Sequence, residues 1–431
     1  MWTILLYRFL FIPCFFLVMP YYAYRMIKRG GYKKDFKYRF GLFKKLPKRK
    51  FGKKRLWIQA VSVGEVKALE KLINLLIESD LYEIVLTTTT STGYELARRM
   101  YASKILFVGL FPFDFWLFSW LAWKRIFPHL AILMESEIWP EHIWQAYLRN
   151  VPVILINARI SDKTLARYKT FPNLAKSTLD NIFYVLASDQ LMADRCYEIG
   201  ISSDRIKIAG NMKFDNRIPR LDPTEASALR RTLGFTKNDL ILLGSSTWPQ
   251  EEAMLIRALK KCRIGDRRWK LLLVPRHAER RNQIIGLLKT SGFKWHQRSK
   301  GKASAEVDIC LADTTGELQT LTSIADLAFI GKSLAPNAGG QSPVDAACHG
   351  VPIVYGDKMT NFKDICLSLE HSKCVVKVKD LARAIMAITI LAKDESKRQN
   401  FAQKLQEWHR NNCGASEFIA KKIQDIAFAN R

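Results

Sequence analysis

The run Leu56-Trp-Ile-Gln-Ala-Val-Ser-Val-Gly-Glu65 and the stretch that follows it to Ser79 decide the fold of this chain. Leu56 to Ile58 is an apolar run typical of a buried strand, and the Ser-Val-Gly sequence at 62–64 predicts a tight turn. Apolar residues then recur every three or four positions, which predicts a helix from Glu65 to Ser79 with one buried face. Glu65 therefore lies in the first turn of a helix, at the carboxyl end of a strand.

The position of Glu65 has two interpretations. Ligands of open α/β sheets bind at the carboxyl ends of the strands, and Gly64 leaves room for a substrate to approach the backbone. A glutamate is also favoured in any helix first turn, because its charge complements the helix dipole. Position alone leaves a catalytic and a structural role open.

Strand and helix signals alternate along the rest of the chain in two similar series. Further apolar strands are predicted at 83–87, 105–108, 130–134, 153–156 and 184–187, and again at 239–244, 270–274, 308–311, 327–330 and 352–355. Such alternation predicts parallel sheets covered by helices on both faces. We expect two Rossmann-like domains, at 56–218 and 219–405, facing each other across a cleft. The last helical stretch, near 396–428, is too long for one helix, and residues 406–431 are expected to cross back to the first domain.

Residues 1–24 are almost wholly apolar and aromatic, and their length is about that of one bilayer span. No small-residue cleavage site follows, so we expect a retained membrane anchor and not a signal peptide. Arg8, Pro13 and Pro20 interrupt the segment. Both a spanning helix and a monotopic helix lying in the interface therefore agree with the sequence.

The net charge of +28 indicates a polyanionic partner, either nucleic acid or an anionic membrane. Fifteen of the Lys and Arg residues lie in the segment 25–55, where Asp35 is the one acidic residue. A basic run directly after an apolar segment is typical of a cytoplasmic flank that faces anionic headgroups. The eight cysteines show neither zinc nor disulfide spacing, which agrees with a reducing cytoplasm. We expect a membrane partner and no nucleic acid.

Polar clusters follow the predicted strands. They are Glu135-Ser-Glu137-Ile-Trp-Pro140, Asn157-Ala-Arg159-Ile-Ser161, Gly210-Asn-Met-Lys213-Phe-Asp215, Ser245-Ser-Thr247 with Glu251-Glu252, Pro275-Arg276-His277 and Gly339-Gly-Gln-Ser-Pro-Val-Asp345. Together with the Gln59 to Glu65 run, these clusters resemble in order and spacing the 3-deoxy-D-manno-octulosonic acid (Kdo) transferases of Gram-negative bacteria. The resemblance extends from the anchor to Asp364.

The resemblance implies an inverting, metal-independent glycosyltransferase of the GT-B architecture, without a cofactor. The donor would be CMP-Kdo and the acceptor a lipid A precursor, lipid IVA, in lipopolysaccharide biosynthesis. The enzyme would be a monomer on the bacterial inner membrane, with its catalytic body on the cytoplasmic face. The family's base falls on Glu65, which we expect to be ionised at neutral pH because of the helix dipole. Lys213 and Arg276 would be the counter-ions of the CMP phosphate, in place of a metal.

The second domain is expected to supply the other donor contacts. The residues implied are Ser246, Pro275, Arg276, His277, Gly331, Ser333, Gly339, Gly340 and Ser342, with Asp345 on the ribose hydroxyls. The glycines among them would let backbone N–H groups approach the phosphate or the sugar carboxylate. Glu135, Glu137 and Arg159 are expected to shape the acceptor side or to have structural roles.

Three runs depart from the family pattern, all in the expected donor half. The usual Gly-Gly-His-Asn-x-x-Glu-Pro is Gly339-Gly-Gln-Ser-Pro-Val-Asp-Ala346 here. The usual Ser-Thr-His is Ser246-Thr-Trp248, and the usual Gly-Gly-Ser is Gly331-Lys-Ser333. Donor geometry or donor identity is therefore where this chain is expected to differ.

Other functions stay open at this point. A membrane-attached GT-B enzyme using a different activated sugar is suggested by the altered loop at 341–346. A non-enzymatic, membrane-tethered polyanion-binding protein is suggested by the charge, and an inactive scaffold is a third alternative. The motifs do not determine how many Kdo residues are added.

Overall fold

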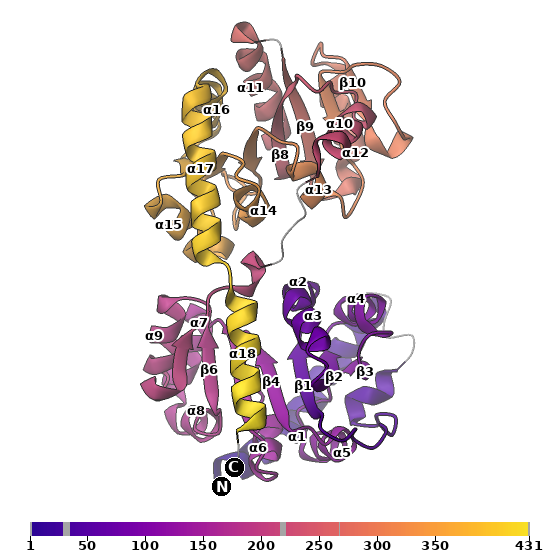
Figure 1. Cartoon of the computed structure of the whole chain (residues 1–431), viewed down its shortest axis with the longest axis vertical. Coiled ribbons are helices and arrows are strands. Elements are labelled where there is room, and N and C mark those ends of the chain that lie inside the picture. Colours follow the sequence, from indigo (N-terminus) through magenta and orange to yellow (C-terminus); the bar gives the residue numbers. More distant parts are fainter. Residues whose placement is uncertain (1, 29–34, 216–220, 267, 430–431) are drawn as a thin grey trace. The chain divides into compact units, whose positions relative to one another are not determined.

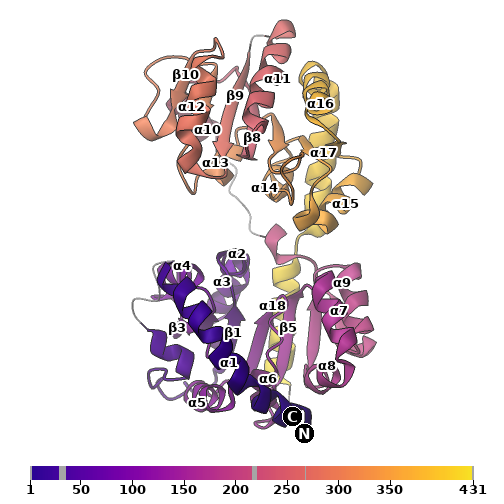
Figure 2. The ribbon, with the colours of Figure 1, turned by 180° about the vertical axis from the view of Figure 1, so that it is seen from behind.

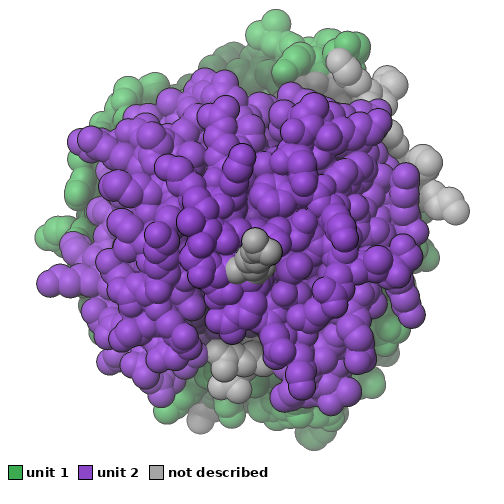
Figure 3. Space-filling model, turned by 90° about the horizontal axis from the view of Figure 1, so that it is seen from above, with its two compact units in different colours: residues 1–216, 412–431 green, residues 217–411 purple. Residues whose placement is uncertain are grey.

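The computed structural model of the chain describes residues 2–28, 35–215, 221–266 and 268–429. The chain forms two compact units: unit 1 comprises residues 1–216 and 412–431, and unit 2 comprises 217–411 (Figure 1; green and purple in Figure 3). The domain boundary expected at 218/219 lies outside the described residues. Unit 2 extends to Asn411 and not to 405, because helix α17 (Glu395–Asn412) continues through the expected boundary.

Unit 1 contains a parallel sheet of seven strands in the order β3-β2-β1-β4-β5-β6-β7. The strands are β1 (Lys54–Ala60), β2 (Tyr82–Thr88), β3 (Phe107–Leu110), β4 (Leu130–Met134), β5 (Val153–Ala158), β6 (Tyr184–Ala187) and β7 (Ile206–Ile208). Most of these strands are buried along nearly their whole length, because helices cover both faces. The strand order reverses between β1 and β4. In open α/β sheets the ligand site lies at the carboxyl ends of such a pair.

The helix predicted at 65–79 differs from the helices observed. It begins at Val63, because Ser62 caps it: the Ser62 Oγ accepts the N–H of Glu65. It is also divided at Leu69 into α2 (Val63–Ala68) and α3 (Glu70–Glu78). The other helices of unit 1 are α1 (Trp2–Lys28), α4 (Ser91–Tyr101), α5 (Trp116–Ile126), α6 (Pro140–Tyr147), α7 (Asp162–Thr170), α8 (Pro172–Leu179), α9 (Gln190–Glu198) and α18 (Ala415–Phe428).

Unit 2 contains a second parallel sheet of seven strands, in the order β10-β11-β9-β8-β12-β13-β14. Its strands are β8 (Leu240–Thr247), β9 (Trp269–Pro275), β10 (Trp295–Gln297), β11 (Ile309–Leu311), β12 (Leu327–Ile330), β13 (Ile353–Gly356) and β14 (Val375–Val378). Its helices are α10 (Pro223–Thr232), α11 (Glu251–Gly265), α12 (Arg281–Lys289), α13 (Leu318–Thr322), α14 (Val344–Cys348), α15 (Lys363–His371), α16 (Leu381–Lys393) and α17. The order reverses between β8 and β12. The prediction of two parallel, Rossmann-like sheets is confirmed.

The last helix, α18, belongs to unit 1 although it follows unit 2 in the sequence. The helical path is interrupted between α17 and α18 at Gly414, which has a φ of +102°. The Asp215 carboxylate accepts the N–H groups of Gly414 and Ser416, and Ile419 and Ile423 enter the core of unit 1. The two views show α18 on one face of the unit 1 sheet and α1 on the opposite face (Figures 1 and 2).

Candidate active site

Glu65 is held by its own turn at the carboxyl end of β1. Its Oε2 accepts the Val61 N–H at 2.7 Å, and its Oε1 accepts a hydrogen bond from the Ser62 Oγ at 3.1 Å. Together with the Ser62 cap, this arrangement resembles a capping box, so Glu65 has the structural role that its position allows. The same bonds fix the direction of a carboxylate that is only 8% exposed.

The ionisation of Glu65 differs from the sequence-based expectation. Burial raises the pKa of Glu65 to about 7; the charges of Glu135 and Glu137 act in the same direction, and the bonds from Val61 and Ser62 oppose them. The helix dipole is therefore outweighed by desolvation, and the carboxyl group is not fully ionised at neutral pH. A carboxyl group that titrates near neutrality is suited to act as a general base.

Glu135 and Glu137 follow β4, the strand beside β1 at the reversal of the sheet order. The Lys213 Nζ donates to the Glu135 Oε1 at 2.7 Å, although 78 residues separate the two in sequence. The Trp139 Nε1 donates to the Glu137 Oε2 at 2.7 Å, and burial raises the pKa of Glu137. Glu65, Glu135, Glu137 and Lys213 thus come together at one edge of unit 1, where Lys213 already has an anionic partner.

Strained backbone accompanies this cluster. Glu135 has a φ of +55° and Asn157, after β5, a φ of +49°. The Asn157 Oδ1 accepts the Met212 N–H at 3.1 Å, next to Lys213, and the Arg159 N–H donates to the Glu135 carbonyl. Non-glycine residues in this conformation cluster at functional sites, because the surrounding structure must hold them there.

The expected donor residues of unit 2 lie at the carboxyl ends of three neighbouring strands. Ser246 lies at the end of β8, Gly331 directly follows β12, and Pro275 ends β9. The side chains of Arg276 and His277, which follow β9, are exposed. The sheet order β9-β8-β12 places all of these residues on one edge, at the reversal point of unit 2.

The N–H groups of three glycines at this edge are hydrogen-bonded within the protein. The N–H groups of Gly331, Gly339 and Gly340 donate to the carbonyl oxygens of Ser245, Lys358 and Lys332, each at 2.9 Å. In this structure these N–H groups therefore bond within the loops, and a contact of these glycines with the donor stays a prediction. A Cβ at Gly331 would lie 2.3 Å from the Ser246 carbonyl oxygen, so this glycine instead allows the loops after β8 and β12 to approach.

Ser333 stabilises the loop after β12 through buried hydrogen bonds. It is fully buried, and its Oγ donates to the Ile330 carbonyl at 2.6 Å and accepts the Gly356 N–H at 2.9 Å. Ser342 and Asp345 lie at the start of α14, where the Ser342 Oγ accepts the Val344 N–H and the Gln319 Nε2 donates to Asp345. Contact of any of these side chains with a donor stays a prediction.

Two residues at this edge were not among the predicted site residues. Lys332 follows β12, and its Nζ lies 4.6 Å from the centre of the Trp248 ring, which follows β8. Glu251, the first residue of α11, is fully buried and accepts the N–H groups of both. Lys332 and Trp248 stand at two of the departures from the family pattern. That coincidence was the sequence signal that could have identified them.

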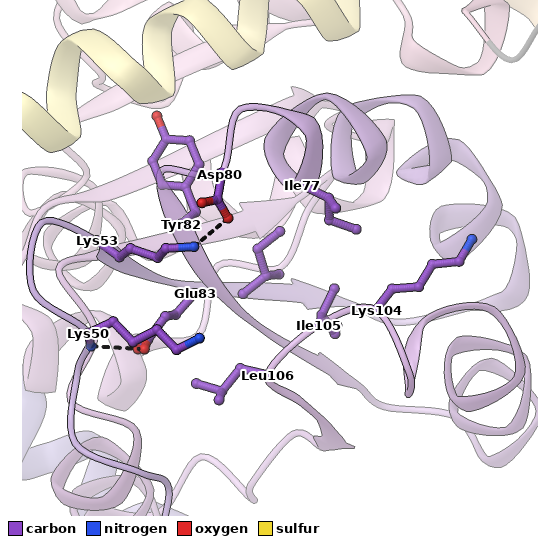
Figure 4. Close-up of a pocket in the computed structure, with 10 residues that line it drawn as sticks. Lys50, Lys53, Ile77, Asp80, Tyr82, Glu83, Lys104, Ile105 and Leu106 are labelled. Carbon is purple, nitrogen blue, oxygen red and sulfur yellow. Dashed lines mark hydrogen bonds and ion pairs between the residues drawn. The ribbon is translucent and has the colours of Figure 1, made fainter.

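A pocket of about 200 Å³ in unit 1 lies elsewhere, at the amino ends of β1 and β2 (Figure 4). Lys53 forms an ion pair with Asp80 there, and the Lys50 N–H donates to Glu83. The residues that line this pocket include none of the expected site residues. In the described part of the chain, no three His, Cys, Asp or Glu side chains are grouped so that they could hold a metal ion.

Comparison with solved structures defines the fold class. The UDP-GlcNAc 2-epimerase of Neisseria meningitidis, bound to UDP-GlcNAc, is 13% identical, with a TM-score of 0.61 over 87% of this chain and 100% of that chain. The Anabaena protein HepE, in complex with UDP and glucose, is 14% identical, with a TM-score of 0.58 over 86% of this chain and 100% of that chain. Two Rossmann-like units of this kind form the GT-B fold.

Sequence comparison then identifies the family. The model of the 3-deoxy-D-manno-octulosonic-acid transferase family matches residues 34–216. A 3-deoxy-D-manno-octulosonic acid transferase of Haemophilus influenzae is 30% identical over 371 residues, covering 84% of this chain and 84% of that protein. One of Bordetella pertussis is 29% identical over 380 residues, covering 86% and 87%. The chain belongs to the Kdo transferase family and is a glycosyltransferase, which confirms the resemblance seen in its motifs.

Proposed function

We propose that this chain transfers Kdo from CMP-Kdo to a lipid A precursor, by an inverting and metal-independent reaction in which Glu65 is the base. Membership of the family supports the class of donor and acceptor. The observation that carries the assignment of the base is the position of Glu65: a buried, oriented carboxylate at the reversal point of the unit 1 sheet, with a pKa of about 7.

In this proposal Glu65 removes the proton of the acceptor hydroxyl while the oxygen bonds to the anomeric carbon of Kdo. The bond from that carbon to the phosphate oxygen breaks, and CMP leaves with the electron pair. Arg276 is the proposed counter-ion of the departing phosphate, because its guanidinium can bind two oxygens at once. Lys213 is the second proposed cation; its ammonium donates one hydrogen bond to Glu135 and has further donors for a phosphate.

The test is an assay of the purified full chain with CMP-Kdo and lipid IVA in detergent, following CMP release and the mass of the lipid product. We expect stoichiometric CMP and a lipid heavier by one or more Kdo residues. A folded sample that releases no CMP would contradict the proposal. CMP-activated or UDP-activated sugars in parallel reactions test the alternative of a different donor.

The pH dependence should report Glu65. Because the unprotonated carboxylate must carry the reaction, kcat/KM is expected to fall as the pH drops below about 7. Ser62→Ala removes a bond that stabilises the charged form, so it should raise the pKa of Glu65 and move this acidic limb to higher pH. Ser62→Thr, which keeps a hydroxyl, is the control and should leave the limb in place. An unchanged limb in the alanine variant would argue against Glu65 as the titrating group.

We also propose that α1 lies in the membrane interface and does not span the bilayer. By length and composition it could cross a membrane. However, the Arg8 Nε and Nη2 donate to both carboxylate oxygens of the fully buried Glu141 at 2.8 and 2.9 Å, and the Tyr7 hydroxyl donates to Asp114 at 2.9 Å. A spanning helix would have to break these bonds within its apolar stretch.

Aromatic packing supports the same arrangement. Phe11 and Phe15 lie one and two turns after Tyr7, and their rings contact Phe115 and Phe113 at centroid distances of 5.4 Å. The opposite face of α1 is exposed and apolar; it includes Trp2, Leu6, Phe9, Phe16 and Leu17. One face thus docks on unit 1 and the other suits the acyl boundary, as in an interfacial helix.

The basic segment divides into structural and available cations. Arg39 and Arg55 are each only 3% exposed and are bonded within unit 1, Arg39 to two carbonyl oxygens and Arg55 to Glu83. Lys44, Lys45 and Lys48 are exposed and are the proposed contacts to anionic headgroups. Part of the charge that suggested a membrane partner therefore stabilises the fold instead.

Labelling distinguishes the two arrangements of α1. A Thr3→Cys variant in a Cys14→Ser background should resist a membrane-impermeant maleimide added to intact spheroplasts and react after lysis, because both ends of an interfacial helix stay on the cytoplasmic side. Lys289→Cys, exposed on unit 2, is the control for lysis. Labelling of the residue 3 variant in intact spheroplasts would show a spanning helix.

A further inference from the structure

The loop after β12 contains a residue in an unfavourable conformation. Lys332 has a φ of +59°, in the left-handed region where the family pattern usually has glycine. A side chain there is strained, because its Cβ comes close to the following carbonyl oxygen. Such strain persists where the surroundings hold it, most often at functional sites. Lys332 also lies at the reversal point of the unit 2 sheet, where α/β sheets bind ligands.

The side chain of Lys332 has a specific contact. Its ammonium lies 4.6 Å from the centre of the Trp248 indole ring, within the range of a cation–π interaction. The Trp248 ring also meets the His277 ring, with centroids 5.3 Å apart and planes at 74°. The two substitutions in the family pattern, at 248 and 332, therefore form one contact, and that contact adjoins a predicted donor residue.

Glu251 joins the two segments through their backbones. Its buried carboxylate accepts the N–H groups of Trp248 at 2.8 Å, Lys332 at 3.0 Å and Ser333 at 3.2 Å. Burial raises the pKa of Glu251 to about 7, so these bonds oppose a substantial desolvation of the charged form. The positions of both side chains are thus set from inside the unit, independently of any ligand.

The acidic neighbour of Lys332, Glu251, bonds to its backbone N–H. Among the described residues, no carboxylate oxygen forms an ion pair with the Lys332 Nζ, and the same holds for Arg276. The nearby Arg280 is different, since it pairs with the fully buried Glu252 at 2.7 Å. Lys332 and Arg276, which follow β12 and β9, are therefore cations without an ion-pair partner in the described part of the chain.

We propose that Trp248 and Lys332 form one donor-binding element, in which the indole holds the ammonium in place to bind an anionic group of the nucleotide sugar. The inference rests on the proposed function. The anionic group is the nucleotide phosphate or the sugar carboxylate, and the Lys332 side chain supplies a donor to it, while the N–H groups of Gly331, Gly339 and Gly340 bond within the loops. Trp248 is the positioning residue of the pair.

The test combines donor affinity with stability. Lys332→Met keeps the apolar stem and removes the charge, and it should raise the KM for CMP-Kdo at least about tenfold, the range expected for a lost charge-assisted hydrogen bond, with kcat little changed. Lys332→Gly should weaken the donor equally while the melting temperature stays the same or rises, because the strain is relieved. If Lys332 had only a structural role, its replacement by glycine would lower the melting temperature and leave the affinity for CMP-Kdo unchanged. Lys289→Ala, an exposed lysine of the same unit, is the matched control.

Two further measurements sharpen the test. Trp248→Leu should lower the affinity for CMP-Kdo as much as Lys332→Met does. The double variant should bind no more weakly than either single variant, because each of the three removes the same binding element. The affinities for CMP and CMP-Kdo, measured by calorimetry, identify the anionic group. If the variants bind both ligands more weakly, Lys332 contacts the phosphate; if they bind only CMP-Kdo more weakly, it contacts the carboxylate. Affinities within twofold of wild type in folded Lys332 variants, or additive effects of the two positions, would overturn the proposal. Binding is measured without turnover, so its outcome is separate from a failure of Kdo transfer.

Discussion

Glu65→Gln is expected to lower kcat for Kdo transfer by about 10²–10⁴-fold, the usual contribution of a general base. Glutamine keeps the shape of the side chain and an acceptor for the Val61 N–H, so the turn before α2 should remain folded. The variant loses only the ability to take a proton. Single-turnover rates with saturating donor and acceptor measure the effect on the chemical step.

The neighbouring acids supply the control for Glu65. Glu137→Gln lies in the same cluster and should retain most of the activity, because Glu137 is bonded to Trp139 and is assigned no proton transfer. CMP should bind Glu65→Gln with little change in affinity, since all the proposed donor contacts except Lys213 belong to unit 2. If Glu65→Gln kept activity while Glu135→Gln or Glu137→Gln lost it, the base would be one of the latter two.

Arg8→Leu is expected to destabilise unit 1 by about 3–5 kcal/mol, the range for removing one partner of a buried ion pair. The variant leaves Glu141 without its charged partner at a site of zero exposure. It is also expected to loosen α1, because the helix then loses its ion pair with unit 1 and keeps the Tyr7 bond and its apolar contacts. Urea unfolding of detergent-solubilised protein measures the loss, and increased protease cleavage within α1 reports the release.

The double variant Arg8→Leu/Glu141→Leu distinguishes an unpaired charge from lost helix packing. If the buried charge is the cause, the double variant should recover much of the stability. Lys169→Leu, which removes an exposed ion pair with Glu198, is the control and should have an effect of about 0–1 kcal/mol. Equal losses in the single and double variants would mean that Arg8 acts mainly through its packing.

The sheets could be predicted because their strands are buried on both faces. Continuous apolar runs such as Leu130–Met134 and Leu327–Ile330 match β4 and β12 at both ends. The strands that were missed, β7, β10 and β14, are short or partly exposed, so their side chains carry little apolar signal. Periodicity reports burial, and these strands lie at or near sheet edges where burial is incomplete.

The start of α2 was misplaced for a different reason. Gly64 favours a turn in a sequence-based prediction. The helix nevertheless runs through it, because Ser62 caps the helix and the Glu65 carboxylate accepts the Val61 N–H. The capping signature, a serine followed three residues later by a glutamate, was present in the quoted run. It decided the local structure, and it also accounts for the structural part of the role of Glu65.

The composition of the site could be predicted better than its interactions. Glu65, Glu135 and Lys213 were identified from strand ends, but the bond of Lys213 to Glu135 joins residues 78 positions apart and depends on the folded chain. The raised pKa of Glu65 likewise depends on burial that the sequence does not state. The sequence shows Lys332 only as a departure from the family pattern, because its contact with Trp248 joins segments that are distant in sequence.

Because α18 belongs to unit 1, the two units differ in when they can finish folding during translation. Ile419 and Ile423 are core residues of unit 1, yet they leave the ribosome after the whole of unit 2. Unit 2 is continuous at 217–411 and can fold as soon as it emerges, whereas unit 1 waits for its last helix. A chain truncated after residue 411 would therefore lack part of the core of unit 1, which contains Glu65. Unit 2 would keep all of its residues, although it is the unit next to the truncation.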